Sequence, residues 1–220
     1  MKLYDAEFAF HPLAVRLLIL ERTGLSLEVQ QVNLFQFDNH KPPYSTEINP
    51  GREEVPALIL DDGTILTDTV AKFEYLDEIA SRGESLYGTT PEERAQTRMM
   101  LRRGDLELAQ PILAWWRNDP DTIKYYKGTR FPIPEARLTQ KIQINQNLNR
   151  WDLELEKTQF LCGNRFSAAD IFVWGILKLV PDTEWVYDPS RKNFMTWWNN
   201  IDGREKSKLG LSTFANRINV

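Results

Sequence analysis

Cysteine and histidine are both scarce in this chain of 220 residues, which contains one cysteine and two histidines. The single thiol, Cys162, excludes an internal disulfide bond and any zinc site built from several thiolates. With only His11 and His40 as imidazoles, most metal centres and catalytic triads lack the side chains that they require. We therefore expect no metal cofactor.

Long apolar runs and an excess of basic residues are also lacking. The longest apolar runs, such as IFVWGILKLV, are well short of the roughly 20 residues that a membrane span requires. The first ten residues show neither the basic segment nor the apolar core of a signal peptide. A net charge of −4 without a long basic run argues against nucleic acid as a partner. These absences favour a cytosolic protein that binds neither membranes nor nucleic acids.

The first part of the chain alternates between strand and helix patterns. Residues 2–8 and 25–34 are expected to be strands, and residues 12–23 between them a helix. An apolar hairpin with an Asp-Asp-Gly turn follows over residues 55–67, and a second helix over residues 68–81. A helix that crosses between two strands implies that they pair in parallel. This order is typical of a thioredoxin-like α/β domain.

The second part of the chain is expected to be helical throughout. All seven tryptophans lie at or after position 115, whereas the strand-like segments lie before position 67. This shift predicts two domains of different class, α/β and all-α. We expect a thioredoxin-like domain over residues 1–82, a linker over 83–90 and an all-α domain over 91–220.

Val55 and Pro56 begin the hairpin within the stretch VPAL. A proline at the start of a strand is compatible with a cis peptide bond, which is inexpensive before proline. A cis turn would expose the N–H and C=O of Val55, which could then pair with a peptide-like ligand as an added strand does. The alternative is a proline that merely begins a strand.

Asp68 and Thr69 stand where the hairpin gives way to a helix. A helix N-terminus offers unpaired N–H groups and the positive end of a dipole to an anion. The hydroxyl of Thr69 would add one donor for a carboxylate, and Asp68 would accept from an ammonium group. The pair would thus hold both charges of an α-amino acid. The alternative is plain N-capping, which both residue types perform often.

Two further motifs lie outside this turn. His40 and Lys41 belong to a proline-bearing loop, where a cation could meet a second carboxylate of a ligand or could simply be solvated. Ser167 and Asp170 have the spacing of a capping box at the start of an apolar helix. We interpret the second motif as a folding feature.

Together these motifs resemble the cytosolic glutathione transferases over nearly the whole chain. The resemblance lies in INPGREEVPALILDDGTILTDT, in AKFEYLDE and in FLCGNRFSAADI, while HKPPYSTEINP is similar to the spacing of phi-like members. It implies glutathione as co-substrate, a hydrophobic electrophile as second substrate, a role in detoxification and a homodimer. It also implies the fold of this family, a thioredoxin-like domain followed by a helical one.

The same resemblance implies positions for the two substrates. The γ-glutamyl carboxylate of glutathione would meet Thr69, and its ammonium group would approach Asp68. The cysteinyl backbone would pair with Val55 ahead of a cis Pro56, and the glycyl carboxylate would meet one of the two cations of the 40–41 loop, His40 or Lys41. The hydrophobic substrate would contact a larger set of side chains, namely Phe10, Leu13, Trp115, Trp116, Tyr125 and Tyr126.

Three departures from the family pattern affect these expectations. The usual Glu-Ser pair is Asp68-Thr69, and a glycine is replaced by Glu53 in a segment that is one residue longer. His11 stands where the family has a serine, cysteine or tyrosine beside the glutathione sulfur. No Ser, Thr, Cys or Tyr lies between positions 5 and 22.

Three roles remain open for His11. It could act on the sulfur as a hydrogen-bond donor, a base or an imidazolium ion. Alternatively, the backbone N–H groups of the helix N-terminus could stabilise the thiolate without a side chain. A third possibility is that His11 merely begins the helix and that the chain binds glutathione without activating its thiol. The sequence therefore predicts a glutathione-dependent transferase, with a binding or regulatory protein of the same fold as the alternative.

Overall fold

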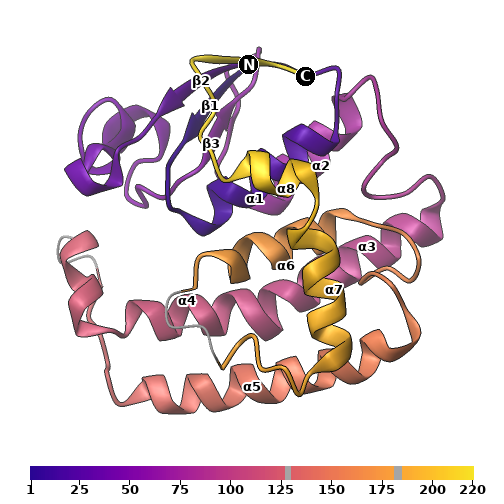
Figure 1. Ribbon diagram of the computed structural model, residues 1–220. Helices are drawn as coiled ribbons and strands as arrows, with labels where there is room; N and C mark the ends of the chain where they lie inside the picture. The colour runs from indigo at the N-terminus through magenta and orange to yellow at the C-terminus, as the bar shows by residue number, and fades with distance from the viewer. Residues whose placement is uncertain (127–129, 181–184) are drawn as a thin grey trace. The chain divides into compact units, whose positions relative to one another are not determined.

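The computed structural model describes residues 1–126, 130–180 and 185–220, and the chain divides into two compact units. The first unit comprises residues 1–89 together with 204–220, and the second comprises residues 90–203. Figure 1 shows the strands in the first unit and the long helices in the second. The expected thioredoxin-like and helical architectures are confirmed. No helix in the described ranges combines the length and apolar character needed to cross a membrane.

A mixed sheet forms the centre of the first unit, with strand order β4-β3-β1-β2-β5. The first two strands pair in parallel, as expected for strands joined by a helix, and the other pairs are antiparallel. The register places Leu3 beside Val29 and Leu58, so that three buried apolar side chains adjoin across the sheet. The strands are β1 (Lys2–Asp5), β2 (Ser26–Gln31), β3 (Ala57–Ile59), β4 (Ile65–Leu66) and β5 (Arg217–Asn219).

Helix α1 (Phe10–Glu21) is the most buried helix of the first unit, and it packs against α2 (Thr69–Ile79) and α8 (Glu205–Gly210). Its Arg16 is almost completely buried and forms an ion pair with Asp5, with 2.7 Å between Nη1 and Oδ1. The same guanidinium donates from Nε to the carbonyl of Gly210 at 2.8 Å. This buried arginine therefore ties β1, α1 and α8 together.

The end of the chain differs from the expectation of an all-helical segment over residues 91–220. Residues 204–220 cluster with the first unit, where Arg204 forms an ion pair with Glu21 of α1 at 2.7 Å. Helix α8 ends at Gly210, and the chain continues into β5, which pairs with β2. The edge of β2 offers unpaired N–H and C=O groups, and a short extended segment satisfies them.

The loop between β2 and β3 packs on the sheet through its own apolar side chains. Tyr44 lies edge-on to Tyr4 of β1, with 5.5 Å between ring centroids. Ile48 and Val32 complete this cluster together with Ala57 at the start of β3. The loop is therefore anchored to the sheet, although it contains only short helical turns: Leu34–Gln36, Asp38–His40 and Tyr44–Ile48.

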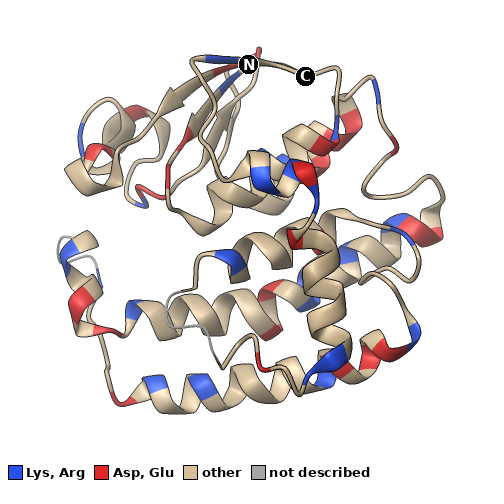
Figure 2. Ribbon diagram, in the orientation of Figure 1, with Lys and Arg blue, Asp and Glu red and all other residues tan. Residues whose placement is uncertain are grey.

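In the second unit, α6 packs against α3 and α7 and is buried over nearly all of its length, as its all-round apolar sequence predicts. A π-helical turn over Asp105–Ala109, just before Pro111, separates the first two helices of this unit. Acidic residues lie in the first turn of α3, and the charged residues that follow along the helix are arginines (Figure 2). The helices are α3 (Pro91–Gly104), α4 (Gln110–Arg117), α5 (Ala136–Glu154), α6 (Ala168–Lys178) and α7 (Lys192–Asp202).

Asp170 organises the start of α6 and is completely buried. Its Oδ2 accepts from the amide and the hydroxyl of Ser167, at 2.9 and 2.8 Å. Its Oδ1 accepts from the amide of Leu161 at 2.9 Å and from the indole N–H of Trp197 at 2.8 Å. Four donors therefore satisfy this one carboxylate, in keeping with the folding role inferred from the sequence.

Candidate functional site

The Val55–Pro56 peptide bond is cis, which is one of the two alternatives left open by the sequence. Val55 precedes β3 and is half-buried, whereas Pro56 is buried. In the described part of the chain, neither the N–H nor the C=O of Val55 has a hydrogen-bond partner. The backbone of Val55 can therefore pair with a peptide-like ligand.

The start of α2 combines a partial cap with unused donors. Asp68 is the N-cap, and its Oδ1 accepts from the amide of Ala71 at 2.8 Å. Its Oδ2, the hydroxyl of Thr69 and the amides of Thr69 and Val70 have no hydrogen-bond partner within residues 1–126, 130–180 and 185–220. N-capping thus uses one of the two carboxylate oxygens, and the remaining groups can serve the ammonium and carboxylate of a ligand.

Lys72 is a residue of this site that sequence reasoning missed. It lies on α2, is completely buried, and donates from Nζ to the carbonyls of Pro56 at 2.9 Å and Thr67 at 2.7 Å. Desolvation by burial is the main cause that lowers the pKa of Lys72 to about 7. The helical period contained the signal, because Thr69, Lys72, Phe73 and Leu76 follow the spacing of one buried face.

The longer segment around Glu53 is held in place by its own hydrogen bonds. Glu53 adopts a left-handed backbone conformation with φ of 58°, and its carbonyl accepts from Nδ2 of Asn39 at 2.9 Å. Its carboxylate pairs with Nδ1 of His40. The carbonyl of Glu54 accepts from Tyr44 Oη and, at 3.0 Å, from Nδ2 of Asn49. The negative charge of Glu53 is therefore directed to a histidine of the same unit.

This pairing changes the expectation for the glycyl carboxylate of glutathione. The side chain of His40 is only 10% exposed and faces Glu53, so a ligand carboxylate would compete with a carboxylate already in place. Lys41 is 54% exposed but pairs with Asp38 at 2.8 Å. We therefore keep Lys41 as the proposed contact and regard His40 as the partner of Glu53.

Lys41 also borders a hollow of about 180 Å³. The other lining residues are Tyr4, Gln30, Gln31, Val32, Asp38, Pro42, Pro43 and Tyr44, which come from β1, β2 and the following loop. Val55, Pro56, Asp68 and Thr69 are not part of this lining. Lys72 thus connects the start of α2 with the Val55 turn. The hollow beside Lys41 is lined by neither of these segments.

His11 is the second residue of α1, and it is half-buried. The preceding N-cap residue, Ala9, provides no side-chain cap, and no acidic residue lies in the first turn. The helix end therefore offers a positive dipole without a built-in anion, which suits a thiolate. Phe10 is half-buried beside His11, but Leu13 is completely buried in the core of the unit. Because no part of its side chain reaches the surface, we no longer place Leu13 in the hydrophobic substrate site.

The predicted aromatic contacts of the second unit differ in exposure. Trp115 is only 6% exposed, lies edge-on to Trp185 at 5.4 Å, and is stacked by the guanidinium of Arg137 at 4.5 Å. It therefore packs within the unit, while Trp116, Tyr125 and Tyr126 remain half-buried. Trp116, Tyr125 and Tyr126 remain proposed contacts for a hydrophobic substrate.

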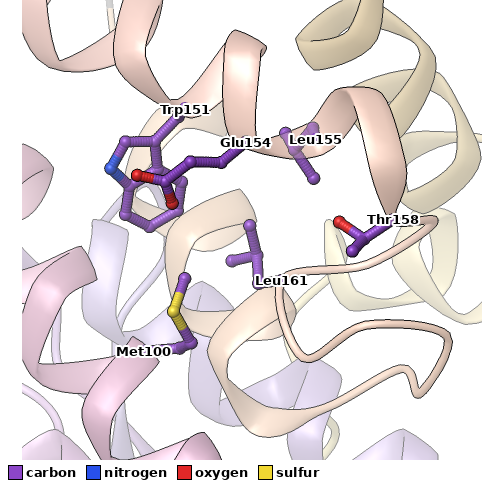
Figure 3. A pocket seen from close by; sticks show the side chains of 6 residues that line it. All are labelled: Met100, Trp151, Glu154, Leu155, Thr158 and Leu161. Carbon is purple, nitrogen blue, oxygen red and sulfur yellow. The ribbon is translucent and has the colours of Figure 1, made fainter.

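A separate pocket of the second unit is too small for such a substrate. It has a volume of about 20 Å³ and lies between α3, α5 and the loop that follows (Figure 3). A cavity of this size holds about one water molecule. Its lining residues are Met100, Trp151, Glu154, Leu155, Thr158 and Leu161.

Other reactive groups do not gather into a second site in the part of the chain that the structure describes. Cys162 is buried, and burial raises the pKa of its thiol, which keeps it in the unreactive form. Within the same described residues, no group of three or more His, Cys, Asp or Glu side chains is arranged to hold a metal ion.

Comparisons with known proteins place this architecture in one family. The family described as "Glutathione S-transferase, N-terminal domain" matches residues 14–79, and "Glutathione S-transferase, C-terminal domain" matches residues 121–205. The chain belongs to the cytosolic glutathione transferase superfamily. Proteins of this superfamily bind glutathione as co-substrate.

Individual members of the superfamily agree with this placement. The chain is 29% identical to glutathione S-transferase 2 of Saccharomyces cerevisiae over 179 residues, which are 79% of this chain and 73% of that protein. It is 33% identical to glutathione S-transferase GstA of Escherichia coli O157:H7 over 132 residues, 60% of this chain and 59% of the relative. The crystal structure of Gtt2 from Saccharomyces cerevisiae superposes with a TM-score of 0.83 at 25% identity, covering 96% of this chain and all of the other.

Proposed function

We propose that this protein is a glutathione transferase that uses the sulfur of glutathione to attack, cleave or isomerise a hydrophobic electrophile. The observation that carries the proposal is the arrangement at the start of α2. There, the unused oxygen of Asp68 and the unused donors of Thr69 and Val70 match the two charges of the γ-glutamyl group. The backbone of Val55 supplies the contact for the middle residue of the tripeptide.

In the conjugation reaction, a bond forms between the sulfur and an electrophilic carbon. The leaving group departs with the electron pair of its bond to that carbon, and the proton of the thiol passes to a base or to solvent. His11 is the proposed base or donor, because it stands at the uncapped start of α1 and an imidazole ring can both accept a proton and donate a hydrogen bond. The dipole of α1 favours the thiolate in addition.

The second substrate and the assembly follow from the family resemblance. We propose that Trp116, Tyr125, Tyr126 and Phe10 contact a hydrophobic electrophile, and that Trp115 supports them from the interior. The proposal further includes a homodimer in the cytoplasm that acts in detoxification without binding nucleic acid or membranes.

Calorimetry followed by a turnover assay tests the proposal. The protein should bind glutathione and should convert a generic aryl halide, which glutathione attacks with loss of halide. His11→Ala should lower turnover about 100-fold with little change in glutathione affinity, as expected for a lost acid–base group. His11→Gln keeps an N–H donor without a titrating group, and it therefore separates hydrogen bonding from proton transfer.

A binding protein without catalytic activity is the second candidate. The observation in its favour is the absence of any hydroxyl or thiol side chain between positions 5 and 22, where the chain passes from β1 into α1. Binding of glutathione without turnover of any aryl halide or epoxide would support this candidate. Failure to bind glutathione would overturn both functions.

A further inference from the structure

Lys72 is a buried cation whose position calls for a functional explanation. Its side chain is completely buried on the inner face of α2, between Thr69 and Leu76. An apolar side chain would fill such a position without cost, whereas burying an ammonium group is unfavourable unless hydrogen bonds compensate it. The two hydrogen bonds to the carbonyls of Pro56 and Thr67, at 2.9 and 2.7 Å, provide that compensation.

These two carbonyls belong to the two backbone segments of the proposed glutathione site. Pro56 directly follows Val55, whose backbone faces the middle of the tripeptide in our proposal. Thr67 directly precedes Asp68, which caps α2 and faces the ammonium group. The ammonium group of Lys72 therefore holds the Val55–Pro56 segment and the Thr67–Asp68 segment together from the interior of the first unit.

The charge of Lys72 is incompletely balanced by its surroundings. The carboxylates of Asp68 and Glu54 favour its charged form, but both hydrogen bonds that Nζ donates go to uncharged backbone carbonyls. Burial outweighs both carboxylates and lowers the pKa of Lys72 to about 7. At neutral pH, a substantial fraction of the free protein would then carry an uncharged Lys72.

We propose that Lys72 is a positioning residue of the glutathione site, which holds the Pro56 and Thr67 carbonyls and supplies the positive charge for a ligand of net negative charge. This inference rests on the proposed function. Glutathione carries two carboxylates and one ammonium group, so that bound glutathione adds negative charge near Lys72. An added negative charge favours the protonated lysine, and binding therefore takes up a proton.

The sign of the pH dependence follows from this coupling. In this proposal, only the protein with protonated Lys72 binds glutathione at full affinity. The free protein loses that proton as the pH rises above about 7. If the ligand raises the pKa by about one unit, affinity falls roughly fourfold between about pH 7 and 8.5. The same shift corresponds to an uptake of about 0.4 proton at about pH 8.

Calorimetry with S-methylglutathione measures this uptake directly. The methyl group removes the thiol proton, whose release would mask the signal, and leaves the charged groups of the tripeptide intact. Titrations in buffers with different ionisation enthalpies, at about pH 8, should show an uptake of about 0.4 proton for the parent protein. At this pH, free histidines are almost entirely neutral.

Two substitutions assign the uptake to Lys72. Lys72→Met removes charge and donors, and Lys72→Gln keeps one donor without a titrating charge. Both variants should bind without proton uptake and with an affinity that is constant between about pH 7 and 8.5, and Lys72→Gln should recover part of the affinity lost in Lys72→Met. Lys192→Met makes the same chemical change at an exposed lysine of the second unit, and it should behave as the parent.

The outcomes separate this inference from the proposed function. If the parent protein does not bind S-methylglutathione, the proposed glutathione site itself fails. If the parent binds without proton uptake, or if Lys72→Gln retains the full uptake, the role of Lys72 is overturned while the glutathione site stands. If Lys72→Met does not fold, Lys72→Gln still assigns the uptake, and an absence of uptake in the parent protein overturns the inference without any variant.

Discussion

The starts of α2 and α6 each carry an aspartate and a hydroxyl residue. They differ in how many of the polar atoms of these side chains form hydrogen bonds within the protein. At α6, four donors surround the carboxylate of Asp170, and every oxygen of the cap has partners within the second unit. At α2, Asp68 uses one oxygen for the cap, and its other oxygen and the hydroxyl of Thr69 have no hydrogen bond among the described residues. A saturated cap serves folding, whereas an incomplete one retains groups that can bind a ligand.

The largest effect is expected when the saturated cap is broken. Asp170→Ala removes the acceptor of four donors and leaves buried N–H groups of Leu161 and Trp197 without partners. We expect a loss of about 3–5 kcal/mol in the free energy of unfolding, measured by urea denaturation. Asp170→Asn keeps one acceptor oxygen and should lose less. A loss below about 1 kcal/mol for Asp170→Ala would contradict the folding role of this cap.

A medium effect, on binding rather than on stability, is expected at the incomplete cap. Thr69→Ala removes the hydroxyl proposed to meet the γ-glutamyl carboxylate, and glutathione affinity should fall by about 1–2 kcal/mol in calorimetry. Thr69→Ser retains the hydroxyl and should bind nearly as the parent. Unchanged affinity in the alanine variant would show that the carboxylate binds elsewhere.

The smallest effect should come from changing only the charge of the α2 cap. Asn is as good an N-cap as Asp, so Asp68→Asn should leave the free energy of unfolding close to that of the parent. Glutathione affinity should fall by less than about 1 kcal/mol, because an exposed charge contact is weak. Asp68→Ala should in addition lose about 1 kcal/mol of stability as the cap disappears. Equal stability of the Asn and Ala variants would mean that the cap contributes nothing.

Sequence patterns indicated those features whose determining residues lie close together in the chain. The cap at Asp68, the turn at Val55–Pro56 and the capping box at Asp170 each depend on residues within a few positions of one another. Because short-range geometry determines these features, residue types and spacing predicted the capping box, and they gave the cis turn and the cap at Asp68 as one of two alternatives each. The strand and helix order of the first unit followed from hydrophobic periodicity in the same way.

Features that depend on long-range contacts were missed. The carbonyls that receive Lys72 lie 5 and 16 residues away in the chain, and the second of these is reached only in the folded unit. Glu53 meets His40 across a loop whose path the sequence does not specify. Leu13 was assigned to a substrate surface because its position near His11 was visible, whereas its complete burial was not.

The pairing of β5 with β2 has a consequence for biosynthesis. The first unit needs residues 204–220 for α8 and for its fifth strand, but these residues are translated after the whole of the second unit. On the ribosome, residues 90–203 can therefore complete their fold while the N-terminal sheet still has an open edge at β2. The nascent chain thus carries an unfinished first unit while the whole second unit is synthesised, and premature termination after residue 203 would leave an aggregation-prone strand edge exposed.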